Sequence, residues 1–209
     1  MEPAKLILWT GEKHGGKTTG AFKLVEAVRN EGFTVAGLLA PSLYHNGRLI
    51  GFDAFDLQSE NRAPLARSKI GTNPAMNCGA KYLAPRSFDL AQDKFTRGLR
   101  RSFADLLPDG IKLGIAALSP TATESADLVI VDEFGPLELD CRGWRKNVDS
   151  LLAFSNAVIL LVVRQELIDA VKQLYRDVPS RELIAGGWNS VGQIITLLRN
   201  RRHRPGKMK

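Results

Sequence analysis

A glycine-rich segment set between an apolar run and a helical pattern constrains this chain most. Residues 5–9, KLILW, have the apolar character of a short buried strand, and residues 11–18, GEKHGGKT, follow almost directly. A helical pattern starts at Lys17, where apolar residues begin to recur at helical spacing. The segment matches G-x-x-x-x-G-K-[ST] at every fixed position, in the strand–loop–helix context of phosphate-binding loops. The sequence therefore predicts a nucleotide-binding loop.

Each residue type in such a loop has a physical task. Glycines let the backbone turn tightly and direct successive N–H groups at an anion, and the start of the helix adds the positive end of its dipole. We expect Lys17 to reach the β- and γ-phosphates and the Thr18 hydroxyl to bind Mg²⁺. The predicted nucleotide-binding residues are Gly11, Glu12, Lys13, His14, Gly15, Gly16, Lys17, Thr18 and Thr19.

Apolar runs alternate with helical patterns along the rest of the chain. Runs typical of buried strands lie at 33–40, 127–135 and 157–163, with a shorter one at 181–185. Helical patterns lie at 95–106, where the helix is expected to end at Pro108, and around 144–152, 167–175 and 190–198. Ser190 and Gln193 form a capping box at the start of the last helix. The alternation predicts an α/β fold with a mostly parallel sheet between helical layers.

Asn46-Gly47 lies between two apolar, aromatic-rich runs. This dipeptide is a strong short-range signal for a β-hairpin, because a type I′ turn needs positive φ at both central residues. We expect an antiparallel hairpin over about 42–58, inserted into the parallel sheet. The chain is then one domain over residues 1–200, followed by a basic tail at 201–209.

Charge and composition limit the classes of partner that we expect for this chain. The formal net charge is +7, but six lysines and arginines lie in residues 199–209, which leaves about +1 for the rest of the chain. An isolated basic end is usually solvated, so this balance argues against nucleic acid as a partner. No apolar run approaches the roughly 20 residues of a membrane span, and no secretory signal is found. Cys78 and Cys141 lack metal-ligand spacing, so we expect them to be reduced cytosolic thiols. Together these features predict a cytoplasmic protein that does not bind membranes.

The strand predicted at 127–135 ends in acidic residues. Asp132 ends the apolar run LVIVD, the setting in which a phosphate loop finds the carboxylate that holds its metal. The predicted metal ligands are Thr18 and Asp132. Glu133 comes next, and a carboxylate there can activate the attacking water; the alternative is that it only caps the strand end.

Several charged residues have two interpretations. Arg164 follows the strand at 157–163, where it would contact the γ-phosphate and stabilise charge in the transition state, or would be a surface arginine. Arg62 and Arg67 would reach across the site as a finger, or are surface charges, whereas Glu138 is interpreted as structural. The predicted catalytic residues are therefore Glu133, Lys17 and Arg164. Because the sequence has no N/T-K-x-D segment, we expect loose base selection.

The chain resembles the small P-loop nucleoside-triphosphatase family, sometimes called cancer-related nucleoside-triphosphatases. The resemblance lies in GEKHGGKTT, in GRLIGFDAFDL leading to APLAR, and in VIVDEFGPLEL, and it spans roughly 6–67 and 126–163. The family pattern D-E-x-G-x-x-E is met by Asp132, Glu133, Gly135 and Glu138. The resemblance implies a RecA-like P-loop NTPase fold and Mg²⁺-dependent hydrolysis of ATP, GTP and other nucleoside triphosphates to diphosphates.

Two other functions use the same loop. A nucleotide kinase or other phosphotransferase would need an acceptor pocket and an arginine-rich lid, for which the predicted helix at 95–106 is the candidate. A nucleotide-dependent adaptor in cofactor assembly, such as the P-loop proteins of molybdenum cofactor biosynthesis, also carries a GKTT loop. The identity of any protein partner stays open.

Overall fold

The computed structural model describes residues 4–11, 15–67, 106–187 and 189–203. The loop residues Glu12, Lys13 and His14, the arginine-bearing helix predicted before Leu106, and Cys78 lie outside the described residues. The strands are β1 Leu6–Gly11, β2 Val35–Leu39, β3 Ser42–His45, β4 Arg48–Asp56, β5 Arg62–Arg67, β6 Leu128–Phe134, β7 Val158–Arg164 and β8 Ser180–Ile184. The helices are α1 Lys17–Asn30, α3 Pro108–Ala117, α4 Pro120–Thr123, α5 Pro136–Leu139, α6 Arg145–Phe154, a 3₁₀ turn at Gln165–Leu167, α7 Ile168–Leu174 and α8 Ser190–Arg202.

One mixed sheet organises the molecule. Its strands follow the order β3-β4-β2-β6-β7-β1-β8, and β5 pairs with β4. The pairs β2–β6, β6–β7, β7–β1 and β1–β8 are parallel. The carboxyl ends of these strands therefore meet at one edge, where open α/β sheets bind their ligands. The predicted α/β fold with a mostly parallel sheet is confirmed.

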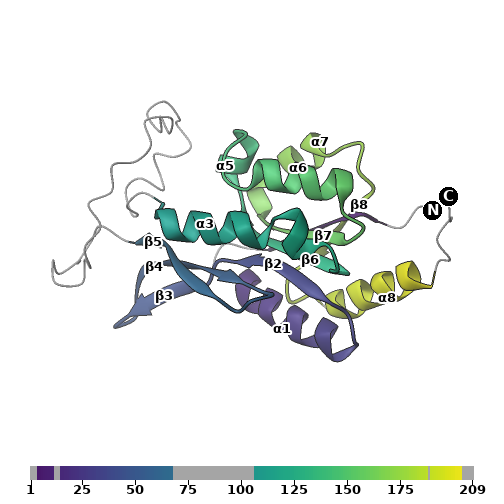
Figure 1. The fold of residues 1–209 in the computed structure, drawn as a ribbon, viewed down its shortest axis with the longest axis horizontal. Coiled ribbons are helices and arrows are strands. Elements are labelled where there is room, and N and C mark those ends of the chain that lie inside the picture. Colours follow the sequence, from purple (N-terminus) through teal and green to yellow (C-terminus); the bar gives the residue numbers. More distant parts are fainter. Residues whose placement is uncertain (1–3, 12–14, 68–105, 188, 204–209) are drawn as a thin grey trace.

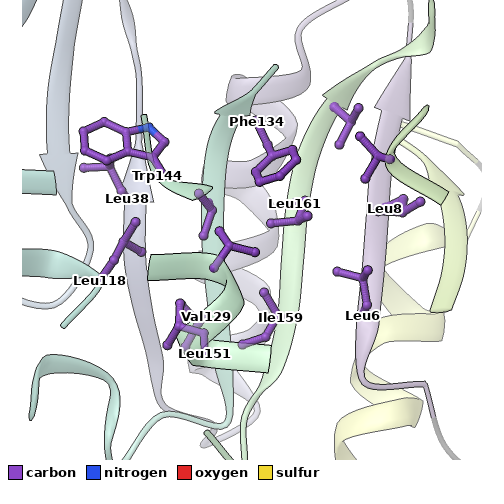
Figure 2. Packing of buried hydrophobic residues seen from close by; sticks show 14 of the residues in the cluster. Leu6, Leu8, Leu38, Leu118, Val129, Phe134, Trp144, Leu151, Ile159 and Leu161 are labelled. Carbon is purple, nitrogen blue, oxygen red and sulfur yellow. The ribbon is translucent and has the colours of Figure 1, made fainter. Parts of the chain in front are cut away.

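Helices cover both faces of the sheet because alternate residues of each buried strand point to opposite sides. In β1, Leu6 and Leu8 join a core with residues of α6 and α7, whereas Ile7 and Trp9 join a second core with α1 and α8. Figure 1 shows α1 and α8 together on one face and α3, α6 and α7 on the other. The first core is drawn in Figure 2, where Leu6 and Leu8 lie in one packed layer with side chains of the neighbouring strands.

The hairpin predicted around Asn46-Gly47 is present. Asn46 has φ 49° and Gly47 has φ 73°, as a type I′ turn requires, and β3 and β4 pair on either side of it. The structure adds a strand that the sequence did not predict, β5, which pairs antiparallel with β4. Pro64 lies inside β5, and proline is confined to edge positions of a sheet because it has no N–H to donate.

The last helix begins at Ser190, as predicted, but two other predicted features of helix ends differ from the structure. Pro108, expected to end a helix, is instead the first residue of α3, a position where proline loses no helical hydrogen bond. Ser190 does not form a capping box: its hydroxyl donates to the Ile184 carbonyl at 2.8 Å and the Gly187 carbonyl at 3.1 Å. Asn189, with φ 62°, is the N-cap of α8 instead.

The last turn of α8 is tied to the body of the protein. The helix continues through Arg202, two residues past the predicted boundary at 200; the division into a domain and a tail stays a prediction. Arg202 donates to Asp127 at 2.9 Å and lies over the Phe33 ring, and Arg199 pairs with Glu31. Within the described part of the chain, no helix has the length and apolar character needed to cross a membrane.

Candidate nucleotide-binding site

The phosphate-loop side of the site lies between β1 and α1. β1 ends at Gly11 and α1 begins at Lys17, after Gly16, whose φ of 71° lies in the left-handed region that glycine adopts freely. No acidic residue lies in the first turn of α1, so the positive end of the helix dipole is not offset there. The Lys17 ammonium donates to the Gly11 carbonyl at 3.1 Å, which holds the side chain along the loop.

Asp132 is the buried centre of the acidic side. Its side chain lies at the end of β6 in a residue only 1% exposed. One carboxylate oxygen accepts from the Thr18 hydroxyl at 2.8 Å and from the Ala40 N–H at 3.1 Å, and the other accepts from the Glu133 N–H at 2.8 Å. Burial, and then the charge of Glu133, raise the pKa of Asp132 to about 6, against the opposing effect of these hydrogen bonds.

The strand that carries Asp132, β6, is not a direct neighbour of β1. β7 lies between β1 and β6. Helix α1 leaves the end of β1 and packs in the same core as residues of β2, β6 and β7, so its first turn passes the end of β6. That crossing brings Thr18 to Asp132.

Glu133 has a backbone conformation unlike that of the strand before it. Its φ is 55°, uncommon for a residue with a side chain, and the β6–β7 register shifts between Val131 and Phe134. The irregularity redirects the strand end, as bulges often do beside functional sites. The Glu133 side chain is 41% exposed, in contrast to the buried Asp132.

Arg164 lies between the two sides of the site. It ends β7, in register with Gly11 of the phosphate loop, and its guanidinium lies 3.4 Å from a carboxylate oxygen of Glu133. Arg164 is thus brought to the site, whereas the other two candidate arginines, at the two ends of β5, contact residues of β4. Arg67 donates to the Phe52 carbonyl and to Asp53, each at 2.7 Å, and Arg62 lies over the Phe55 ring.

Glu138, interpreted from the sequence as structural, is buried next to the turn that follows Asp132. The residue is 3% exposed, and its carboxylate accepts from the Gly135 N–H at 2.8 Å and the Trp144 N–H at 3.1 Å. No sequence pattern pointed to Trp144 or to the Ala40 N–H as part of the site. Both are backbone donors whose place depends on the order of strands and helices, not on a local pattern.

The donors at the end of β6 fit a magnesium ion. A hydroxyl and a carboxylate, from Thr18 and Asp132, converge within 2.8 Å, and hard oxygen donors of this kind suit Mg²⁺. Among the described residues no group of three or more His, Cys, Asp or Glu residues is placed to hold a metal. Mg²⁺ typically keeps several waters and is bound by one or two protein ligands together with substrate phosphates. A donor set as small as Thr18 and Asp132 is therefore sufficient for it.

The fold and site define a P-loop NTPase: a glycine loop between β1 and a helix, with a carboxylate facing it at the carboxyl edge of a mainly parallel sheet. A family model described as NTPase matches residues 6–107 and 90–196, and the chain belongs to that family. The predicted enzyme class, nucleoside-triphosphatase, is confirmed at this level.

Individual relatives agree with the family. The nucleoside-triphosphatase THEP1 of Methanothermobacter thermautotrophicus is 26% identical over 167 residues, which cover 80% of each chain. The solution structure of a human cancer-related nucleoside triphosphatase superposes with a TM-score of 0.61 at 21% identity, covering 98% of this chain and 100% of that one. The crystal structure of THEP1 from Aquifex aeolicus gives a TM-score of 0.59 at 18% identity, covering 92% and 98%. These two structures support the fold.

Proposed function

We propose that the protein hydrolyses nucleoside triphosphates to the diphosphate and inorganic phosphate in a Mg²⁺-dependent reaction. The observation that supports this most is the contact between the Thr18 hydroxyl and Asp132 at 2.8 Å, with the exposed carboxylate of Glu133 beside it. A metal-binding oxygen pair and a separate carboxylate then face the same loop. This arrangement suits hydrolysis, because the carboxylate that does not bind the metal can accept a proton from the attacking water.

In the proposed reaction the chain's own residues bind, orient and accept a proton. Backbone N–H groups of the loop and the Lys17 ammonium hold the phosphates. Thr18 and Asp132 would hold Mg²⁺, which offsets the charge that develops on the β- and γ-phosphate oxygens. Glu133 accepts a proton from a water molecule as the water oxygen bonds to the γ-phosphorus, and the bond from that phosphorus to the β–γ bridging oxygen breaks. Arg164 contacts the γ-phosphoryl oxygens.

We infer broad base preference, with ATP, GTP and other nucleoside triphosphates as substrates. The sequence lacks an N/T-K-x-D segment for guanine, and the residues proposed to bind the nucleotide would act on its phosphates. Since the phosphates are common to all nucleotides, binding through them does not select a base. We also expect the protein to act in the cytoplasm.

Phosphate release from ATP, GTP, CTP and UTP, each with Mg²⁺ or with EDTA, tests the proposal. We expect all four to be hydrolysed with kcat/KM values within about tenfold of one another, that is about 1.4 kcal/mol in activation free energy, and no release in EDTA. Negligible release from all four with Mg²⁺ would overturn hydrolysis. Rescue by a small-molecule acceptor would then identify a phosphotransferase, and release only with a protein partner would identify an adaptor.

A further inference from the structure

The carboxylate of Glu138 is buried next to the turn that follows Glu133. It belongs to α5, which begins one residue after Gly135, and it accepts the N–H groups of Gly135 and Trp144. Burial is the main cause that raises its pKa to about 7. Burying an ionisable group is costly, so its position here calls for a reason beyond filling space.

One of its two partners ends the strained turn that carries Glu133. A residue other than glycine held at positive φ is strained and persists only where its surroundings fix it. Glu133, with φ 55°, is such a residue. The Gly135 N–H lies two residues further on, at 2.8 Å from Glu138, so the carboxylate fixes the far end of the turn.

The other partner belongs to the rigid interior. Trp144 is 6% exposed and packs in the core with Leu38, as Figure 2 shows. A Cβ atom at Gly114 would come within 2.4 Å of its ring, so α3 also lies directly against it. The neighbouring Gly143 has φ 54°, and a Cβ atom there would lie 2.0 Å from a Glu138 oxygen. The space around Glu138 is therefore shaped to hold its carboxylate in one place.

We propose that Glu138 is a positioning residue for Glu133: it ties the turn at residues 133–135 to the packed layer around Trp144 and so fixes where the Glu133 carboxylate points. The inference rests on the proposed function, in which Glu133 accepts the proton of the attacking water. A purely structural Glu138 would support the fold without affecting the chemical step selectively.

The first test replaces the carboxylate by an amide. In Glu138→Gln one acceptor oxygen becomes an NH₂ group that faces a backbone N–H, so one hydrogen bond is lost and two donors oppose each other. We expect kcat for ATP to fall by about tenfold or more, the scale of a displaced general base, while the Kd for Mg-ADP changes less than about twofold. Glu124→Gln, at an exposed glutamate, is the matched control and should change neither.

The second test is a double-mutant cycle with Glu133→Gln. If Glu138 acts through Glu133, the double variant has the same kcat as Glu133→Gln alone, because there is no base left to position. Multiplicative losses, or an unchanged kcat in Glu138→Gln, would overturn the inference. Wild-type turnover of Glu133→Gln would instead overturn the assignment of Glu133 as the base, a failure of the proposed function that the cycle reports separately.

A further variant covers the case in which Glu138→Gln does not fold. Gly143→Ala places a methyl group against an oxygen of the Glu138 carboxylate and leaves its charge intact. Measured below its melting temperature, it should show the same selective loss of kcat and the same absence of effect in the Glu133→Gln background. A loss of kcat and Mg-ADP affinity together would overturn the inference.

Discussion

The two sides of the site are built in different ways. The phosphate-loop side depends on backbone shape: Gly16 in the left-handed region, the start of α1, and Lys17 lying along the loop against Gly11. The acidic side depends on buried side chains, since the Asp132 carboxylate accepts three hydrogen bonds and the Glu138 carboxylate two. One side presents groups to an anion, and the other fixes two carboxylates before any substrate arrives.

Because the two sides are built differently, we expect substitutions on them to change different kinetic quantities. Contacts to the β-phosphate and the loop are made equally in the ground state and the transition state, so losing them weakens binding. Contacts that place the proton acceptor matter only as the reaction proceeds, so losing them lowers kcat. Variants on the two sides should therefore fall into two separable groups.

Removing the loop lysine is expected to have the largest effect. Lys17→Ala deletes the positive charge that we propose contacts the phosphates, and we expect both nucleotide binding and turnover to be abolished. Isothermal titration calorimetry with Mg-ADP and a phosphate-release assay measure the two quantities. Lys23→Ala, at an exposed lysine on the same helix, should bind and turn over like the wild type. Retained Mg-ADP affinity in Lys17→Ala would contradict the assignment of the loop side to binding.

The strand and the helix that flank the loop were predictable because they are contiguous in the sequence. A strand, a glycine loop and a helix lie within about 25 residues, and each has its own local pattern. The hairpin was predictable for the same reason, since the dipeptide Asn46-Gly47 is by itself a strong signal for a type I′ turn. Strand β5 was missed because Pro64 argues against a strand unless the sheet edge is known.

The acidic side was only partly predictable because its parts are far apart in the chain. Asp132 and Glu133 could be found from the end of an apolar run. The intervening strand β7, the Ala40 N–H and the Trp144 N–H depend on sheet order and on how α5 and α6 follow β6. The positive φ of Glu133 has no local signal either, because the residue is not glycine and its conformation is imposed by the bulge and by Glu138.

The burial of Glu138 predicts a pH-dependent stability. Its pKa is about 7 in the folded chain against 4.5 for the ordinary value, so the folded state binds the proton more tightly. Stability from this group is therefore full below about pH 4.5 and falls as pH rises towards 7, by about 3 kcal/mol in total. Urea unfolding of the wild type and Glu138→Gln at pH 5 and pH 8 measures this, because the other titrating groups cancel in the difference. We expect the wild type to lose stability relative to the variant between the two pH values; a constant difference would contradict the raised pKa.

Arg164 can sharpen the comparison, because it contacts both sides. It lies in register with Gly11 of the loop and 3.4 Å from the Glu133 carboxylate. If it serves the transition state, its charge acts on the γ-phosphoryl group alone. Arg164→Ala should then lower kcat by about tenfold, the scale of one charge-assisted hydrogen bond, and leave Mg-ADP affinity unchanged because ADP has no γ-phosphate.

Two further variants decide what the arginine contributes. Arg164→Lys keeps a positive charge but not the planar fork of donors, so it should restore part of the lost kcat. Arg176→Ala, at an arginine with a side chain 69% exposed and paired only with its neighbour Asp177 among the described contacts, should have no effect. The contradicting result would be an equal loss of affinity for Mg-ADP and for a nonhydrolysable triphosphate in Arg164→Ala. Such a loss would show that Arg164 acts without the γ-phosphate. Arg164 would then support nucleotide binding, like the loop residues, and not the chemical step.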